Sequence, residues 1–590
     1  MKDFKDLPRG EYPRPDRVRE DWLCLNGQWD FAFDEAGVGI DEGWMYKEAL
    51  DLKITVPFTY QSQLSGINDL RHSDFIWYTR TFKVPAEFAG KRVLLHFGAV
   101  DYKAKVYLNG QFIGEHEGGY APFNFDITHL TKDLDAEYRL TVCCEDTLST
   151  EQPRGKQSYM PAPFGCWYTP CSGIWQSVWL EAVGMKYIED VRITPDYDNA
   201  CFTVETLLSA TPKNGAVKMD VSFRGRFVTS VTVTAVENRV ENVIYFHHDH
   251  GSLEGFEAWE PGSPCLYDLT LTLIEEGNAV DTLSTYFGMR KIQCEGGRIY
   301  INNHELYQRL ILDQGYWPDG LLTAPTDEAL KRDIELTMAM GYNGARKHQK
   351  FEDPRYLYWA DRLGLLVWAE LPSPYRFTDA MKRNCYRDMS EAIKRDYNHP
   401  CIITWVPMNE SWGIYQVKSH REQQMFTDSL YYMIHALDKT RIVSSNDGWE
   451  NPQTDIVTVH DYASFTRDLS PEYKSTEGIL TGIPNGFRTV VADGYDLSGK
   501  PMMMTEYGGI ALAKDKHGDN WGYGGAETDE EKFFARFEDI TMGFKNCDYF
   551  CGYCYTQLTD VFQEVNGLLD MDRNPKVDLD RIRRINEKRR

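Results

Sequence analysis

The pattern of apolar and polar positions divides this chain of 590 residues into two parts, one before and one after residue 296. In the first part, short segments alternate apolar with polar side chains, which is the pattern of strands that bury one face. Residues 105–108 form such a segment, and the Asn109-Gly110 pair that follows is a strong hairpin-turn signal. The pattern predicts an all-β sandwich over residues 1–182 and an immunoglobulin-like β-sandwich over residues 183–290.

The second part alternates apolar, strand-like runs with segments of helical periodicity, as parallel βα units do. Helices are expected over residues 327–340 and 354–363. The pattern predicts a (β/α)₈ TIM barrel over residues 291–590, with an active site at the carboxyl ends of its strands. The eight strands are expected to end near Ile311, Arg346, Trp368, Val406, Ser445, Val459, Thr505 and Tyr555.

Two of these strands lead into a glutamate. The fourth continues through Asn409 into Glu410, and the seventh leads into Glu506. Because the carboxyl ends of parallel strands meet at one rim of a barrel, the two side chains are expected to lie together, and paired carboxylates there suit cleavage of a glycosidic bond. A single glutamate at a strand end is more often a solvated charge, but the neighbouring Asn, Trp, Tyr and Gly residues suit a sugar. The sequence therefore predicts a carbohydrate substrate.

Composition excludes other classes of partner. The chain carries 64 basic and 89 acidic residues, a formal net charge of −25, without a block of lysine and arginine. Attraction to nucleic acid or to an anionic membrane is therefore not expected. The first residues lack the apolar core of a signal peptide, and no segment approaches the roughly 18 apolar residues of a membrane span. A cytoplasmic location is the expectation that follows.

Cysteine and histidine clusters give no convincing metal site. The 13 cysteines are irregularly spaced, which fits reduced thiols better than a disulfide framework. Cys551 and Cys554 resemble a metal or redox pair, but without a second ligand pair they are predicted to be buried core thiols. The His-His-Asp-His run at residues 247–250 is predicted to be a polar loop. We expect no metal and no cofactor, and a metal-dependent enzyme remains a weaker alternative.

Three motifs resemble, in order and spacing, those of glycoside hydrolase family 2, the β-galactosidase and β-glucuronidase family. They are Ser-Gly-Ile-Trp-Gln-Ser-Val-Trp-Leu-Glu at residues 172–181, Asn-His-Pro followed by Asn-Glu within residues 398–410, and Thr-Glu-Tyr-Gly at residues 505–508. The resemblance covers nearly the whole chain and implies a jelly-roll sugar-binding sandwich at the amino terminus. It further implies an exo-acting, retaining enzyme with Glu410 as general acid and then base and Glu506 as nucleophile. Dimers and tetramers are common in the family, so homo-oligomerisation is left open.

These roles require two different environments. The acid must hold a proton near neutral pH, so the pKa of Glu410 is expected to be raised, whereas the nucleophile must be ionised. By resemblance, Asn409 binds the sugar 2-hydroxyl and Arg346 braces the nucleophile carboxylate. Many relatives carry histidine three residues after this arginine. Here Gln349 stands at that position and His348 one residue earlier, so hydroxyl recognition at that edge is expected to differ.

Five further candidates lie on the predicted catalytic rim. Asp313 follows the first strand, and His460 and Tyr462 lie at the end of the sixth. Each of these three either contacts the sugar or supports the rim. Trp412 and Tyr555 either form a stacking face for the sugar or pack in the core.

One departure from the family bears on the identity of the sugar. Family glucuronidases carry, shortly before a glycine, an Asn-x-Lys motif that reads the uronate carboxylate, and the corresponding stretch here, residues 561–569, contains no lysine. Because a carboxylate in a closed pocket needs a cationic partner, the missing lysine favours a neutral sugar such as galactose. A β-glucuronidase or β-galacturonidase is the alternative, with cationic contacts from residues just beyond strand ends: Lys347, Lys350, Lys514, Lys516 and His517.

A catalytically silent carbohydrate-binding protein is a further alternative. A binder needs no complete pair of acid and nucleophile, so the presence of both Glu410 and Glu506 favours an enzyme.

Overall fold

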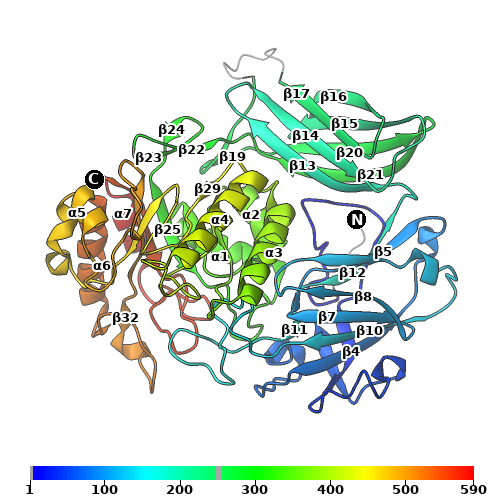
Figure 1. Ribbon diagram of the computed structural model, residues 1–590, viewed down its shortest axis with the longest axis horizontal. Coiled ribbons are helices and arrows are strands. Elements are labelled where there is room, and N and C mark those ends of the chain that lie inside the picture. The colour runs from blue at the N-terminus through cyan, green and yellow to red at the C-terminus, as the bar shows by residue number, and fades with distance from the viewer. Residues whose placement is uncertain (1–3, 5, 247–254, 590) are drawn as a thin grey trace.

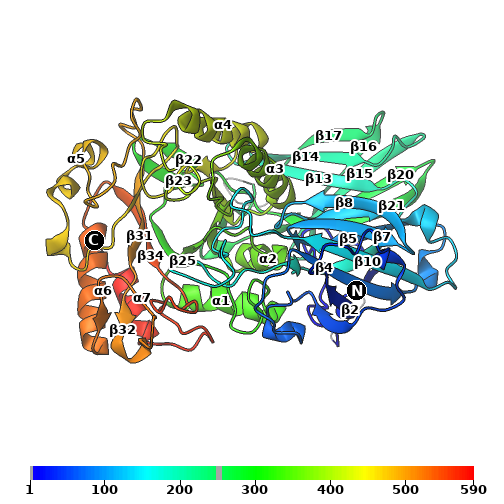
Figure 2. The ribbon, with the colours of Figure 1, turned by 60° about the horizontal axis from the view of Figure 1, so that its bottom comes forward.

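The structure is a computed structural model that describes residue 4, residues 6–246 and residues 255–589. The chain forms two β-sandwiches and an α/β barrel, and both sandwiches, coloured blue to green, lie on one side of the barrel (Figure 1; Figure 2). The histidine-rich run at residues 247–250 lies outside the described residues. Among the described helices, none is long and apolar enough to cross a membrane.

The first sandwich packs a six-stranded sheet against a four-stranded sheet, and apolar side chains such as Trp29, Tyr78 and Leu95 fill the space between them. The six-stranded sheet has the order β3 (Leu52–Val56), β2 (Gly27–Phe33), β4 (Phe75–Phe82), β10 (Tyr138–Glu145), β7 (Lys103–Leu108), β8 (Gln111–Glu117). The four-stranded sheet has the order β1 (Trp22–Cys24), β12 (Val178–Val183), β5 (Arg92–Phe97), β9 (Phe123–Asp126).

The second sandwich packs a three-stranded sheet against a four-stranded sheet around Phe202, Val217 and Leu271. Its strands bury every second residue, as the alternating sequence predicts. The sheets have the orders β13 (Ile188–Asp196), β14 (Cys201–Leu208), β17 (Arg239–Tyr245) and β16 (Arg226–Ala235), β15 (Gly215–Phe223), β20 (Tyr267–Glu275), β21 (Asn278–Phe287).

Eight parallel strands form the sheet of the barrel, and all eight predicted strands are present. The largest error is in the seventh, which ends at Gly508 rather than near Thr505. Among the described residues no ladder joins the fifth strand to the sixth, so the sheet is open there. In chain order the strands are β25 (Gln308–Asp313), β26 (Gly344–Lys347), β27 (Leu366–Glu370), β28 (Ile402–Val406), β29 (Ile442–Val443), β30 (Val457–His460), β31 (Met502–Gly508) and β34 (Phe550–Thr556).

Helices connect most of these strands, and the predicted helices over residues 327–340 and 354–363 are confirmed as α1 and α2. The hydroxyl of Thr326 caps α1, and Pro354 occupies the first turn of α2, where a missing N–H costs nothing. No described helix separates β29 from β30, so the two strands are joined by a loop, residues 444–456. The helices are α1 (Asp327–Ala339), α2 (Pro354–Leu363), α3 (Asp379–Asp396), α4 (Arg421–Leu437), α5 (Thr476–Thr481), α6 (Glu530–Lys545) and α7 (Leu579–Glu587).

Asn398 and His399, from the second family-like motif, tie the barrel to the second sandwich. Asn398 Oδ1 accepts the N–H of Ile193 (2.8 Å), and its Nδ2 donates to the carbonyl of Val191 (2.9 Å). His399 Nδ1 lies 3.4 Å from the hydroxyl of Tyr286 in the second sandwich and 2.5 Å from Oδ2 of the buried Asp361. This part of the motif therefore joins two domains, whereas the glutamate that ends it lies at the catalytic rim.

The Asn398→Ala variant is expected to lower the free energy of unfolding by about 2–4 kcal/mol, because a buried N–H and a buried carbonyl each lose a hydrogen-bond partner. Urea denaturation measures the loss. The exposed Asn199 supplies a matched control, and Asn199→Ala is expected to change stability by less than about 0.5 kcal/mol. Equal losses in both variants would contradict a stabilising role for this domain contact.

Candidate active site

Glu410 and Glu506 face one another at the carboxyl-end rim. Glu506 lies within β31, and Glu410 lies in the turn after β28 with φ 51°, a backbone region that costs a non-glycine residue energy and recurs at active sites. One oxygen of each glutamate and one ring nitrogen of His460 all lie within 4.8 Å of one another. A separation of about 5 Å between carboxyl groups is typical of retaining glycosidases.

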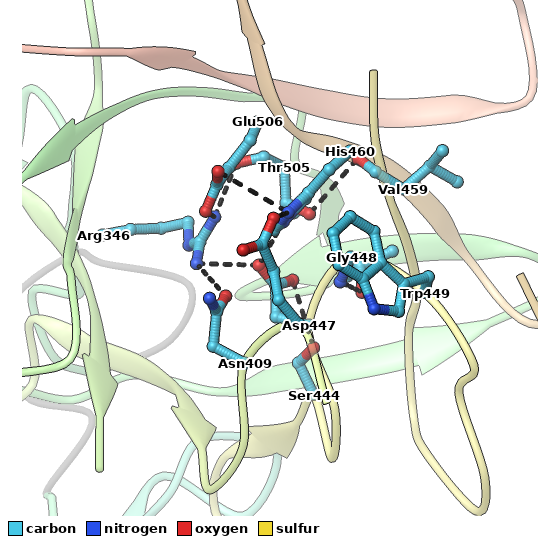
Figure 3. A network of polar contacts seen from close by, with 12 residues as sticks. Arg346, Asn409, Ser444, Asp447, Gly448, Trp449, Val459, His460, Thr505 and Glu506 are labelled. Atoms are coloured by element: carbon cyan, nitrogen blue, oxygen red, sulfur yellow. Dashed lines mark hydrogen bonds and ion pairs between the residues drawn. The ribbon is translucent and has the colours of Figure 1, made fainter. Parts of the chain in front are cut away.

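Arg346, on β26, is the centre of the polar network around Glu506 (Figure 3). Its side chain is fully buried. Three carboxylates surround it: Nε lies 2.7 Å from Glu370 Oε1, Nη2 lies 2.7 Å from Asp447 Oδ2, and Nη1 lies 3.3 Å from Glu506 Oε1. Nη2 also donates to Asn409 Oδ1 (3.2 Å). One guanidinium thus sets the positions of groups from four segments of the barrel.

Two of these carboxylates, Glu370 and Asp447, were not predicted from the sequence. Glu370 ends β27, so the third strand, like the seventh, is an apolar run that leads into a glutamate. Glu370 was missed because this strand was expected to end two residues earlier, at Trp368. Asp447 lies in the polar run between β29 and β30, and its carbonyl accepts the N–H of Glu410 (2.8 Å). The density of polar residues after the fifth strand is the signal that could have pointed to Asp447.

His460, the last residue of β30, lies between Glu410, Glu506 and Asp447. Its Nδ1 is 2.9 Å from Glu410 Oε1 and 3.5 Å from Glu506 Oε2, and its Nε2 is 2.8 Å from Asp447 Oδ2. Burial lowers the pKa of His460, but the carboxylates, Glu506 and Asp447 foremost, outweigh burial and raise that pKa to about 10. The side chain is therefore an imidazolium at neutral pH.

The imidazolium changes the expected behaviour of Glu410. Burial raises the pKa of Glu410, but the hydrogen bond and the positive charge of His460 outweigh burial and leave the pKa below its ordinary value. The expectation of a raised pKa at Glu410 is therefore wrong in this arrangement. The proton lies on the histidine of the hydrogen-bonded pair instead.

Asn409 and Tyr462 complete the immediate surroundings of Glu506. The oxygen of the Asn409 amide is held by Arg346, while its buried Nδ2 has no hydrogen-bond partner among the described residues. A buried donor without a partner is rare and is suited to a ligand hydroxyl. The Tyr462 hydroxyl donates to Glu506 Oε2 (2.7 Å).

The structure brings His348 and Gln349 to this group but not Asp313. His348 Nδ1 lies 2.9 Å from Glu370 Oε2, and its Nε2 lies 3.9 Å from a Glu506 oxygen. Gln349 lies beside His348, and its buried Oε1 has no hydrogen-bond partner among the described residues. Asp313 instead pairs with Lys347 (2.8 Å).

Trp412 and Tyr555 have different surroundings. Trp412 is half-buried and packs edge-on against Trp167 of the first sandwich, with ring centroids 5.2 Å apart. Tyr555 is fully buried and packs edge-on against Tyr507 and Phe537 at 5.5 and 5.0 Å. Tyr555 thus lies in the core, and the structure does not bring it together with the two rim glutamates.

Residues 154–168 of the first sandwich lie against the rim of the barrel. The N–H of Gly155 donates to the carbonyl of Ser373 (3.1 Å), just beyond β27. Gln563 Nε2 donates to the carbonyl of Gly165 (2.9 Å) from the segment beyond β34. A loop of one domain therefore forms part of the site in another.

Lys156 and Glu564, neither predicted from the sequence, lie where this loop contacts the barrel. Glu564 accepts hydrogen bonds from the Tyr168 hydroxyl (2.7 Å) and from Asn566 Nδ2 (3.2 Å). Lys156 is 8 % exposed. Burial lowers its pKa, but Cys166, Glu564 and the two rim glutamates outweigh burial and raise that pKa above its ordinary value. A protonated lysine and a glutamate from two domains thus lie near the two rim glutamates.

The five residues that the sequence offered as cationic contacts for a uronate either form ion pairs with other residues or lie at exposed positions. Lys347 and Lys350 both pair with the buried Glu352, at 2.9 and 3.0 Å. Leu568, in the stretch that corresponds to the glucuronidase Asn-x-Lys motif, is fully buried. The remaining three residues lie at exposed positions: Lys514, Lys516 and His517.

One group of potential metal ligands exists among the described residues, and it consists of Glu410, His460 and Glu506. Both ring nitrogens of His460 already lie within hydrogen-bond distance of carboxylates. As an imidazolium, His460 has no free lone pair for a metal ion. The absence of a metal requirement stays a prediction. Cys551 and Cys554 are buried free thiols, as predicted.

Comparison with known families gives three matches that together span most of the chain. Residues 23–181 match the sugar binding domain of glycosyl hydrolases family 2, residues 186–290 match the family 2 model without a further domain description, and residues 292–588 match the family 2 TIM barrel domain.

Characterised relatives carry two kinds of name. The chain is 29% identical to a β-galactosidase of Thermoanaerobacter pseudethanolicus over 71% of its own length and spans only 54% of that protein. It is 24% identical to a β-glucuronidase of Paenibacillus borealis, with 83% of each chain covered. The structure of an uncultured Clostridium sp. β-glucuronidase superposes with a TM-score of 0.77 at 24% identity, covering 97% of this chain and 99% of that one. At this identity the superposition supports the fold alone.

The His460→Gln variant tests the buried imidazolium. Because the pKa of about 10 in the folded chain exceeds the ordinary 6.5, protonation of His460 stabilises the fold fully below about pH 6.5, and this stabilisation is lost as the pH rises towards 10. The loss of Tm caused by the substitution is therefore expected to be larger at pH 6 than at pH 10. Thermal unfolding of both proteins measures it, and a loss independent of pH would contradict the assigned charge.

Proposed function

Because this chain belongs to glycoside hydrolase family 2 and is a β-glycosidase, we propose that it removes a terminal neutral sugar of the β-galactoside type with retention of configuration. One observation carries the proposal: two glutamates within 4.8 Å of each other have different partners. Glu506 contacts Arg346 and Tyr462, whereas Glu410 contacts His460. An unlike pair of this kind suits a nucleophile and an acid.

The reaction follows from these positions in two steps. The Glu506 carboxylate attacks the anomeric carbon, and the bond to the leaving group breaks with its electron pair on the leaving oxygen, which takes a proton from Glu410. A glycosyl ester on Glu506 results. Glu410, now a carboxylate, takes a proton from water as the water oxygen attacks the anomeric carbon and releases Glu506. Two inversions give net retention.

The surroundings of Glu506 support its role as nucleophile. Arg346 and Tyr462 each contact a different oxygen of the carboxylate, which fixes the plane from which it attacks. The free Nδ2 of Asn409 lies on the same network and is suited to the sugar 2-hydroxyl, a contact that strengthens in the transition state.

The Glu410–His460 pair supports the acid role in spite of the lowered pKa of Glu410. The two side chains lie 2.9 Å apart and titrate as a pair, so the pair keeps a proton although Glu410 alone does not. As negative charge develops on the leaving oxygen, that proton can pass from His460 to Glu410 and on to the leaving group.

The preference for a neutral sugar rests on the charges around the site. Two cations, Arg346 and His460, already face Glu370, Asp447 and the two rim glutamates. Beside Lys156 stands Glu564, and burial raises the pKa of Glu564 above its ordinary value. As a carboxylate Glu564 would repel a uronate, and in either protonation state it can form hydrogen bonds with hydroxyls. A sugar hydroxyl, which both donates and accepts, fits this mixed pair better than an anion does.

A second candidate, cleavage of a β-uronide, is favoured by Lys156 and by the names of several relatives. The ammonium group of Lys156 is buried at the site, and it forms no ion pair with the described residues. In addition, several relatives are named β-glucuronidases. In this arrangement the uronate carboxylate would bind Lys156 in competition with Glu564.

A panel of chromogenic glycosides with one common leaving group tests the choice. The value of kcat/KM for a β-galactoside or another neutral β-glycoside is expected to exceed that for the β-glucuronide and β-galacturonide at least about tenfold. A preference for a uronide that is lost selectively in Lys156→Met would replace the proposal with the second candidate.

The Glu410→Gln variant tests the acid role. Because the amide cannot donate the catalytic proton, kcat/KM for an alkyl glycoside is expected to fall about 10²–10⁴-fold, and that for a dinitrophenyl glycoside, whose leaving group needs no proton, far less. Steady-state kinetics with both substrates measure the difference. Equal losses for the two leaving groups would contradict proton donation by Glu410.

A further inference from the structure

A pocket with a volume of about 660 Å³ opens beside Glu410 and His460. Its walls come from the segment that follows β30, around Tyr462, and from Pro484 and Phe487. Glu506, Arg346 and Asn409 do not line it. In the proposed reaction, Glu410 protonates the leaving oxygen, so a cavity on its side lies where the leaving group would be and not where the cleaved sugar would be.

Aromatic rings form much of this pocket. Tyr462 and Tyr523 stack with ring centroids 3.5 Å apart, and Trp449 packs edge-on against Phe487 at 5.1 Å. Phe487 is 63 % exposed, which is unusual for so large an apolar side chain. A ligand in the pocket would remove that ring from water. Pockets of about 300–1,000 Å³ with aromatic walls suit flat apolar molecules.

The indole of Trp449 adds a polar feature. Trp449 is 8 % exposed, and its Nε1–H has no hydrogen-bond partner among the described residues. Buried indole N–H groups usually have a partner. A ligand that carries an oxygen acceptor would supply one.

Most of the charged side chains that line the pocket are acidic. Asp461, Asp468 and Glu410 contribute carboxyl groups, and the only lining cation among the described residues, His460, is already surrounded by Glu410, Glu506 and Asp447. An anionic leaving group would find no free cationic partner here. The pocket therefore selects against negative charge.

The pocket wall is tied to the turn that carries Glu410. The Ser411 hydroxyl donates to Oε2 of the buried Glu450 (2.8 Å), and Arg488 Nη1 donates to its Oε1 (2.9 Å). Asn485 Nδ2 donates to the carbonyl of His460 (3.4 Å). These contacts fix Phe487, the neighbour of Arg488, relative to the acid, so the pocket is formed before a ligand arrives.

We propose that this pocket is the leaving-group site and that it takes an uncharged aromatic aglycone bearing an oxygen acceptor. The inference rests on the proposed glycosidase function. A second sugar is the competing occupant, since sugars also stack on aromatic rings, but the exposed Phe487 and the mutually stacked tyrosines favour a flat apolar ligand over a polyhydroxylated one.

Kinetics with three glycosides of the sugar chosen by the panel test the proposal. The glycosyl fluoride has no aglycone, the 2-naphthyl glycoside has an aromatic one, and a disaccharide has a sugar there. In Phe487→Ala, the ratio of kcat/KM for the naphthyl glycoside to that for the fluoride is expected to fall about tenfold, mainly through KM. Phe227, which is 73 % exposed on β16 of the second sandwich, supplies the matched control, and Phe227→Ala is expected to leave the ratio unchanged.

Direct binding keeps the test independent of turnover. Titration of the protein with free 2-naphthol, followed by tryptophan fluorescence, is expected to give a Kd at least fivefold higher in Phe487→Ala than in Phe227→Ala. The anion 2-naphthoate is expected to bind at least fivefold more weakly than 2-naphthol. Equal Kd values for the two variants, or a disaccharide preferred to the naphthyl glycoside with the same dependence on Phe487, would overturn the proposal. Naphthol binding without turnover of the fluoride would instead contradict the glycosidase function.

Discussion

The buried guanidinium of Arg346 is the constraint on which the catalytic rim depends. Moving such a charge out of water costs several kcal/mol, and only close, well-oriented anions offset the cost. Here Glu370, Asp447 and Glu506 supply them, each from a different segment of the barrel. Because loss of one partner would leave the others uncompensated, the strands β26, β27 and β31 and the loop after β29 are held in one arrangement. The carboxylate of Glu506, the proposed nucleophile, thereby has a fixed position before any substrate binds.

The same network gives two chemically identical side chains, Glu506 and Glu410, different surroundings. Glu506 contacts the fixed cation and the Tyr462 hydroxyl, whereas Glu410 lies on the more exposed side and shares a proton with His460. His460 also contacts Asp447, which itself contacts Arg346. The proposed nucleophile and acid are therefore coupled through one chain of charges, of which Figure 3 shows Glu506, Arg346, Asp447 and His460. The sandwich segment that carries Lys156 covers the adjacent part of the rim, so the sugar-recognising surface depends on how two domains pack.

Local patterns in the sequence predicted the barrel well, because parallel strands buried on both faces appear as continuous apolar runs and their order along the chain fixes the rim. The residues missed were those whose role depends on tertiary contacts. Glu370 has the same local pattern as Glu506, and only the structure distinguishes a supporting carboxylate from the rim pair. Lys156 belongs to another domain, and no pattern near it indicates that it reaches the barrel. Tyr555 was a candidate stacking face by its strand-end position, yet it is fully buried.

The central claim is that Glu506, held by Arg346, becomes covalently attached to the sugar. Reaction with the 2-deoxy-2-fluoro glycoside of the preferred sugar, bearing a dinitrophenyl leaving group, slows breakdown of the intermediate and allows its detection by mass spectrometry of proteolytic peptides. The account predicts that the mass of the sugar is added to the peptide containing Glu506 and to no other. A label on the peptide containing Glu410, Glu370 or Glu564, with Glu506 unmodified, would contradict it.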